Sequence, residues 1–117
     1  MDGFHRVRSV DQVQPGQMTL TQVQRELVLL ANVDGTFYAV SARCTHDNVM
    51  LPFGRLQGDV AICPAHYAQF SVITGKVLEG PTDIDLRRYA VKVEGDDVFV
   101  GPPLNTSVDS SESGGTP

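Results

Sequence analysis

The chain places both of its cysteines and two of its three histidines in one ordered pattern within residues 43–70. Cys44 and His46 form a Cys-x-His pair. Cys63 and His66 form a Cys-x-x-His pair after an interval of 16 residues. Each pair can occupy its own loop, because the interval ends in a short β-prone run that returns the chain to the same place. The pattern therefore predicts two loops that converge on one metal site.

Two thiolates and two imidazoles could hold either a tetrahedral zinc ion or a binuclear iron-sulfur cluster. Zinc sites of this composition usually gather their cysteines on one turn and their histidines on a helix. In this sequence each loop supplies one ligand of each kind, which favours two metals over one. A structural zinc module remains the alternative, and absorption in the visible range would distinguish a coloured cluster from colourless zinc.

The two pairs and their surroundings resemble the Rieske iron-sulfur family, and more specifically its soluble ferredoxins. The resemblance rests first on Cys44-Thr45-His46 and Cys63-Pro64-Ala65-His66. It spans about ninety residues. Further positions that match the family are Leu51, Gly54, Gly58, Phe70, Thr74-Gly75, Gly80-Pro81, Leu86 and Tyr89.

The resemblance implies one Rieske-type 2Fe-2S cluster as the cofactor. In this family one iron takes two thiolates and the other takes two imidazoles. This division implies Cys44 and Cys63 on the first iron, with His46 and His66 on the second. Neutral imidazoles leave the oxidised site with two fewer negative charges than four thiolates would, so the site accepts an electron more readily.

Four other positions of the two loops predict a potential near the low end of the Rieske range, roughly −150 mV. High-potential relatives carry a disulfide between the loops, at positions that are Val49 and Ala65 here. They also carry a serine and a tyrosine that donate hydrogen bonds toward sulfur, at positions that are Ala68 and Phe70 here. Without these donors the reduced cluster is less stabilised.

The sequence departs from the family directly after the second histidine. Rieske ferredoxins commonly have a glycine at one of the next two positions, and Tyr67-Ala68 fills both here. Because residues with a Cβ seldom take a positive φ, we expect the backbone of this loop to be less free to adopt one.

Length and charge limit the remaining possibilities. A chain of 117 residues predicts one Rieske domain, residues 1–101, with the cluster loops within 43–70. Residues 102–117 are rich in Ser, Gly and Pro and predict a disordered tail. The net charge of −5 argues against nucleic acid or an anionic membrane as the partner. No apolar run suits a signal peptide or a membrane span, so we expect a cytoplasmic protein.

The secondary structure is predicted to be almost wholly β. A helical turn with Ser9 as its cap is expected at 9–13, and Asp34-Gly35 predicts a two-residue hairpin. Together these elements predict an all-β Rieske fold, an antiparallel base sandwich or barrel with a small two-loop subdomain. The predicted strands are residues 4–8, 18–23, 26–33, 36–42, 59–62, 69–73, 76–77, 88–93 and 97–100.

The resemblance implies a monomeric one-electron carrier with no catalytic residues of its own. Such carriers pass electrons from a flavin-containing, NAD(P)H-oxidising ferredoxin reductase to a terminal oxygenase in bacterial aromatic hydrocarbon catabolism. The alternatives are the small Rieske-like subunit of an assimilatory nitrite reductase and the carrier of a di-iron monooxygenase. We expect the partner to dock on an apolar tip around the histidines, which comprises Val49, Met50, Leu51, Pro52 and Tyr67.

Overall fold

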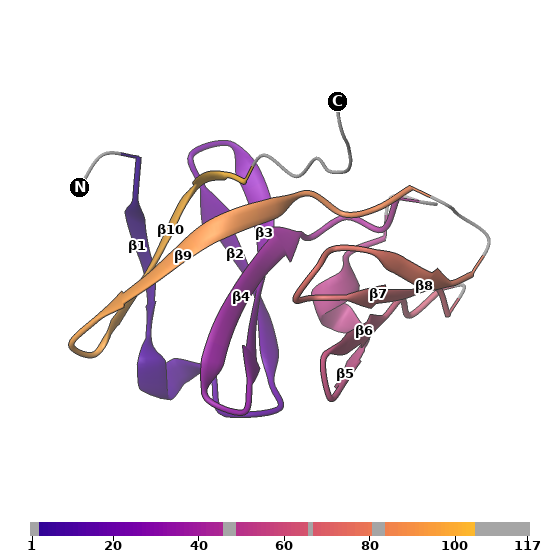
Figure 1. Cartoon of the computed structure of the whole chain (residues 1–117), viewed down its shortest axis with the longest axis horizontal. Coiled ribbons are helices and arrows are strands. Elements are labelled where there is room, and N and C mark those ends of the chain that lie inside the picture. The colour runs from indigo at the N-terminus through magenta and orange to yellow at the C-terminus, as the bar shows by residue number, and fades with distance from the viewer. Residues whose placement is uncertain (1–2, 46–48, 66, 81–83, 105–117) are drawn as a thin grey trace.

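The computed structural model describes residues 3–45, 49–65, 67–80 and 84–104. Within these ranges ten strands form two antiparallel sheets that lie next to each other (Figure 1). The predicted all-β class is therefore confirmed. No helix within the described ranges is long and apolar enough to cross a membrane.

The larger sheet, which we call the base, has six strands in the order β1-β10-β9-β4-β3-β2. It is nearly closed, because Arg8 on one edge strand donates from Nη2 to the Leu20 carbonyl on the other edge at 2.8 Å. The six strands are β1 (His5–Ser9), β2 (Met18–Val23), β3 (Glu26–Val33), β4 (Thr36–Ser41), β9 (Arg88–Glu94) and β10 (Asp97–Pro103).

The smaller sheet has four strands in the order β5-β6-β7-β8. With its connecting loops it forms what we call the small lobe, seen beside the base in Figure 1. Both predicted ligand pairs adjoin this lobe, one before β5 and one between β6 and β7. The four strands are β5 (Arg55–Gln57), β6 (Val60–Ile62), β7 (Gln69–Ser71) and β8 (Val77–Glu79).

Strand β3 joins the cores of the base and the small lobe. Successive side chains of a strand point to opposite faces, so its apolar run supplies both sides. Val28 and Leu30 pack in the core of the base. Leu29 and Ala31 pack in a second core, which contains both cysteines and residues of the small lobe. The lobe is thus attached to the base by a continuous apolar contact rather than by a linker.

Most predicted strands are confirmed, and those at 18–23 and 26–33 have their predicted bounds. The helical turn is confirmed as the 3-10 turn η1 (Val10–Gln12), where the Ser9 N–H donates to the Gln12 side chain at 2.8 Å. Strand β5 was not predicted, because a three-residue strand with one apolar residue, Leu56, is too short to show an alternating pattern.

The predicted end of the last strand is wrong by three residues. Strand β10 continues to Pro103, and the Leu104 N–H donates to the Arg88 carbonyl at 2.8 Å. Pairing with β9 therefore outweighs the poor strand propensity of the two prolines. The rest of the predicted tail, 105–117, lies outside the described residues, and the domain boundaries stay a prediction.

The base also contains a buried tyrosine that links strands β3 and β9. The Tyr89 hydroxyl donates to the Glu26 carboxylate at 3.2 Å, and Arg87 lies 3.9 Å from the same carboxylate. Burial, and then the negative charge of Glu26, raise the pKa of Tyr89 above its ordinary value. The hydroxyl therefore stays protonated as a donor within the base.

Candidate metal centre

The first cysteine begins a loop that two strand-like contacts close at its base. The Cys44 N–H donates to the Val49 carbonyl at 2.9 Å. Next to it, Arg43 and Met50 form an isolated antiparallel bridge. These contacts bring the chain back on itself within six residues, from Cys44 to Val49.

The second cysteine begins a loop that is closed in the same way. The Cys63 N–H donates to the Ala68 carbonyl at 2.8 Å, and the Tyr67 N–H donates to the Cys63 carbonyl at 3.1 Å. Gly54 permits the neighbouring chain to pass closely, since a Cβ at Gly54 would lie 1.9 Å from the Ile62 carbonyl oxygen. A side chain at that position would therefore displace the residue that precedes Cys63.

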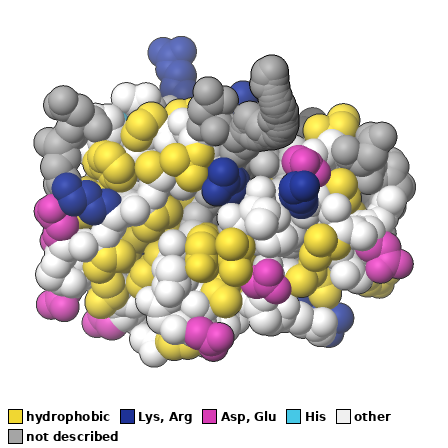
Figure 2. Space-filling view, in the orientation of Figure 1, with side chains coloured by type: hydrophobic (Ala, Val, Ile, Leu, Met, Phe, Trp, Pro, Cys, Tyr) yellow, Lys and Arg dark blue, Asp and Glu magenta, His cyan; other side chains and the backbone are white. Residues whose placement is uncertain are grey.

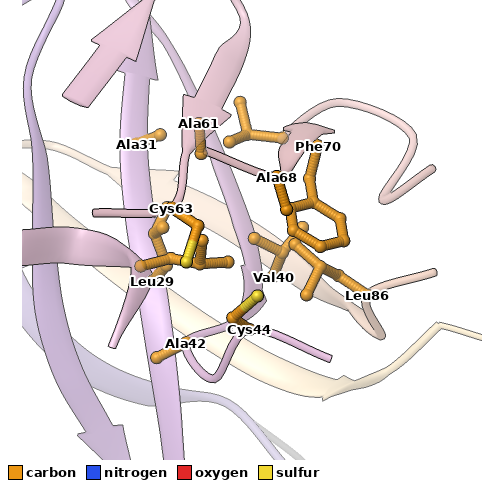
Figure 3. Close-up of a cluster of buried hydrophobic side chains, with 12 residues drawn as sticks. Leu29, Ala31, Val40, Ala42, Cys44, Ala61, Cys63, Ala68, Phe70 and Leu86 are labelled. Carbon is orange, nitrogen blue, oxygen red and sulfur yellow. The ribbon is translucent and has the colours of Figure 1, made fainter. Parts of the chain in front are cut away.

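The two loops share one construction, in which each cysteine donates its N–H to the carbonyl five residues later. Cys44 is 4% exposed and Cys63 is fully buried. Both belong to one cluster of buried side chains, and Figure 3 labels both within it. Two buried thiols in one core suit a shared iron as thiolate ligands.

The other two predicted ligands, His46 and His66, lie outside the described residues. Within the described ranges, no group of three or more His, Cys, Asp and Glu side chains could hold a metal ion. This is expected when only the thiol half of a four-ligand site falls inside those ranges. The assignment of the four ligands as a set stays a prediction.

Tyr67 shows that the expectation for the second loop was wrong. Its φ is +60°, in the left-handed region that glycine usually occupies. This conformation lets the chain reverse so that the Ala68 carbonyl reaches the Cys63 N–H. The loop keeps the backbone shape that a glycine would give, and Tyr67 adopts it at a steric cost of about 1–2 kcal/mol.

We expect Tyr67→Gly to raise the stability of the protein by about 0.5–1 kcal/mol, measured as the urea midpoint for loss of visible absorption. Relief of the left-handed strain outweighs the entropic cost of a glycine, about 0.5–1 kcal/mol. Few packing contacts are lost, since Tyr67 is 70% exposed. Tyr67→Ala is the control, because it removes the ring and keeps the Cβ. Equal stabilisation by both variants would assign the effect to the ring.

Ala68 and Phe70, where high-potential relatives have hydroxyl donors, are both fully buried in the core that holds the cysteines. We expect Ala68→Ser together with Phe70→Tyr to raise the midpoint potential, measured by redox titration. One charge-assisted hydrogen bond of about 1.5 kcal/mol would shift a one-electron potential by roughly 60 mV. An unchanged potential in a variant whose new hydroxyls reach sulfur would contradict the argument.

The predicted apolar tip is wrong for one of its residues. Leu51, at the start of the 3-10 turn η2 (Leu51–Phe53), is fully buried in the core with both cysteines. The exposed apolar residue of this turn is Phe53, which is 71% exposed and was not predicted. Phe53 and Tyr67 line one groove of about 400 Å³ together with Arg55 and Cys63.

Residues 3–90 match the family described as the Rieske [2Fe-2S] domain. The chain belongs to the Rieske family. Its cofactor is therefore a Rieske-type 2Fe-2S cluster, and the structural zinc alternative is abandoned. The twin loops, each starting at a buried cysteine, lie within the matched residues.

Relatives of this Rieske domain include the ferredoxin component of biphenyl 2,3-dioxygenase from Rhodococcus jostii (strain RHA1). It is 39% identical over 95 residues, which cover 81% of this chain and 89% of the relative. Among solved structures, the ferredoxin of carbazole 1,9a-dioxygenase from Nocardioides aromaticivorans IC177 aligns with a TM-score of 0.83 and 30% identity. That alignment covers 86% of this chain and 99% of the ferredoxin.

A further solved structure contains a ferredoxin together with an oxygenase. It is a complex of reduced oxygenase and oxidised ferredoxin in carbazole 1,9a-dioxygenase. Its matching chain aligns with a TM-score of 0.80 and 30% identity over 86% of this chain and 94% of that chain. The two-sheet fold described above is thus the fold of Rieske ferredoxins.

Proposed function

We propose that this protein is the one-electron carrier of a ring-hydroxylating dioxygenase system. It would accept electrons from a flavin-containing NAD(P)H-dependent ferredoxin reductase and deliver them to a terminal oxygenase. The observation that carries the proposal is the pair of buried thiols on twin loops in a domain that covers 89% of a dioxygenase ferredoxin component. The named relatives favour a dioxygenase over a nitrite reductase or a di-iron monooxygenase.

In this proposal Cys44 and Cys63 hold the cluster through their thiolates, and His46 and His66 hold it through their imidazoles. When bound, the cluster supplies reversible one-electron chemistry. Apolar side chains surround the two cysteines, since Leu51 and Phe70 are fully buried in the same core. No group of the protein needs to act as an acid, a base or a nucleophile in this role.

We further propose that the partner contacts the groove beside the second loop. Phe53 and Tyr67 are the two most exposed of the large apolar side chains within the described ranges. Cys63 is also among the residues that line this groove. A partner bound there would therefore lie close to a proposed cluster ligand. A small contact of this kind suits a carrier, which must release its partner at every turnover.

The protein has more acidic than basic residues, 14 against 9. On the face seen in Figure 2, acidic and basic side chains are interspersed. The net charge of the whole chain is −5. We propose that this negative charge guides a partner with a basic face.

The test is a reconstituted electron-transfer chain. The purified protein should contain two irons and two acid-labile sulfides, and a flavoprotein reductase with NADH should reduce it. Addition of an aromatic-ring oxygenase should then reoxidise it, and substrate hydroxylation should require its presence. A protein that is reduced but never reoxidised by such oxygenases would contradict the dioxygenase assignment. A monomeric state and a cytoplasmic location complete the proposal.

A further inference from the structure

A side-chain hydrogen bond connects the first cluster-binding loop to a segment far away in the sequence. Thr45 stands between Cys44 and His46, and its hydroxyl donates to the Ile84 carbonyl at 2.7 Å. The two residues are 39 positions apart. The first loop is therefore held from outside as well as by its own backbone closure.

The acceptor of this bond is fixed by the residues that follow it. The Asp85 carboxylate accepts a hydrogen bond from the Val77 N–H of β8 at 2.9 Å. Leu86 is 4% exposed in the core that holds both cysteines, and its N–H donates to the Gly75 carbonyl at 2.7 Å. Three consecutive residues, Ile84 to Leu86, thus connect the first loop with β8 and the core.

The end of β8 also touches the second loop. Gly80 has a φ of +130°, and a Cβ at this position would lie 2.7 Å from the Cα of Ala68. Ala68 is fully buried and its carbonyl closes the second loop onto Cys63. Gly80 therefore lies against the second loop, and Ile84, four residues later, is bonded to the first loop.

We propose that Thr45 is a positioning residue, and that its hydrogen bond to Ile84 fixes the loop in which its neighbour Cys44 would bind iron. The proposal rests on the proposed ligand set. Groups that orient metal ligands affect both the retention and the electronic properties of a metal centre. Asp85 and Leu86 fix the position of Ile84. They would therefore influence a ligand that is distant from both of them in the sequence.

The experiment compares Thr45→Val with Thr45→Ser in the cluster-loaded protein. Valine keeps the shape of threonine and loses the donor, whereas serine keeps the donor. With Thr45→Val we expect the visible absorption to bleach about fivefold faster in excess iron chelator, the factor that corresponds to one ordinary hydrogen bond. We also expect altered g values in the electron paramagnetic resonance spectrum of the reduced protein. Thr45→Ser should behave as wild type in both measurements.

Asp85→Ala provides a second, independent test of the proposal. This variant should also accelerate the bleaching by the chelator. Its effect should not add to that of Thr45→Val, because both variants act through the hydrogen bond at Ile84. Wild-type bleaching by Thr45→Val, serine behaving like valine, or fully additive effects of the two variants would each overturn the proposal. A folded Thr45→Val protein that binds no cluster supports it, provided that Thr45→Ser does bind one. These readouts need no partner, so they are separate from the test of the carrier function.

Discussion

Cys63→Ser is expected to yield a folded or partly folded protein with no cluster, which iron and sulfide assays and the visible spectrum will show. The Cys63 side chain is fully buried beside Cys44, so no solvent ligand can take its place. A serine hydroxyl is a poor ligand at neutral pH, because metal sites of this kind need a deprotonated soft donor. Cys44→Ser is expected to have the same effect.

Two control variants separate the ligands from their surroundings. Ala65→Ser introduces the same hydroxyl on the same loop at an exposed position, and it should retain the full cluster. His5→Ala changes the histidine that lies in β1, outside both loops, and should also retain it. A wild-type protein with one zinc per chain and no labile sulfide would contradict the ligand assignment, as would a Cys63→Ser protein with the full complement of iron.

Leu51→Asp and Phe53→Asp are expected to have opposite outcomes although they lie two residues apart. Leu51 is fully buried among the residues around both cysteines, so a carboxylate there would lose its hydration and its neighbours their packing. Such a change costs several kcal/mol, a large part of the stability of a small domain. We expect Leu51→Asp to yield little or no cluster-loaded protein in iron and sulfide assays.

Phe53→Asp should instead leave the visible spectrum and the midpoint potential nearly unchanged. Phe53 is 71% exposed, so its replacement disturbs the surface of the groove and not the core. Transfer to the oxygenase, followed by stopped-flow absorption, should slow about tenfold, which corresponds to the loss of one apolar contact of about 1.4 kcal/mol. Phe53→Leu, which keeps an apolar side chain, should retain most of the rate. Equal rates for Phe53→Asp and wild type would rule out the groove as the contact.

The sequence by itself determined the elements that depend on local patterns. The spacing of Cys44, His46, Cys63 and His66 predicted two converging loops and, by resemblance, the Rieske family, which the family match confirms. The β-prone runs on either side of the Asp34-Gly35 turn placed the β3–β4 hairpin of the base correctly to within one residue. These features could be predicted from the sequence because each depends on residues that are neighbours or are separated by a short interval.

Only the tertiary structure decided what each apolar residue of the loops does. Leu51 and Phe53 are both apolar and nearly adjacent, yet one is buried and the other exposed, because the 3-10 turn directs only Leu51 into the core that contains both cysteines. Tyr67 takes a conformation that its type disfavours, because the hydrogen bonds that close the Cys63 loop compensate for the strain.

The hydrogen bond from Thr45 to Ile84 has no trace in either segment alone, since 39 residues separate its two ends. The same is true of the short strand β5, which pairs with β6 and has no apolar pattern of its own. Such features form only when distant segments pack together, because the contact between the segments supplies the free energy that stabilises them. A sequence pattern can therefore predict the ligands of this protein, while the contacts that close the loops of Cys44 and Cys63 appear only in the folded chain.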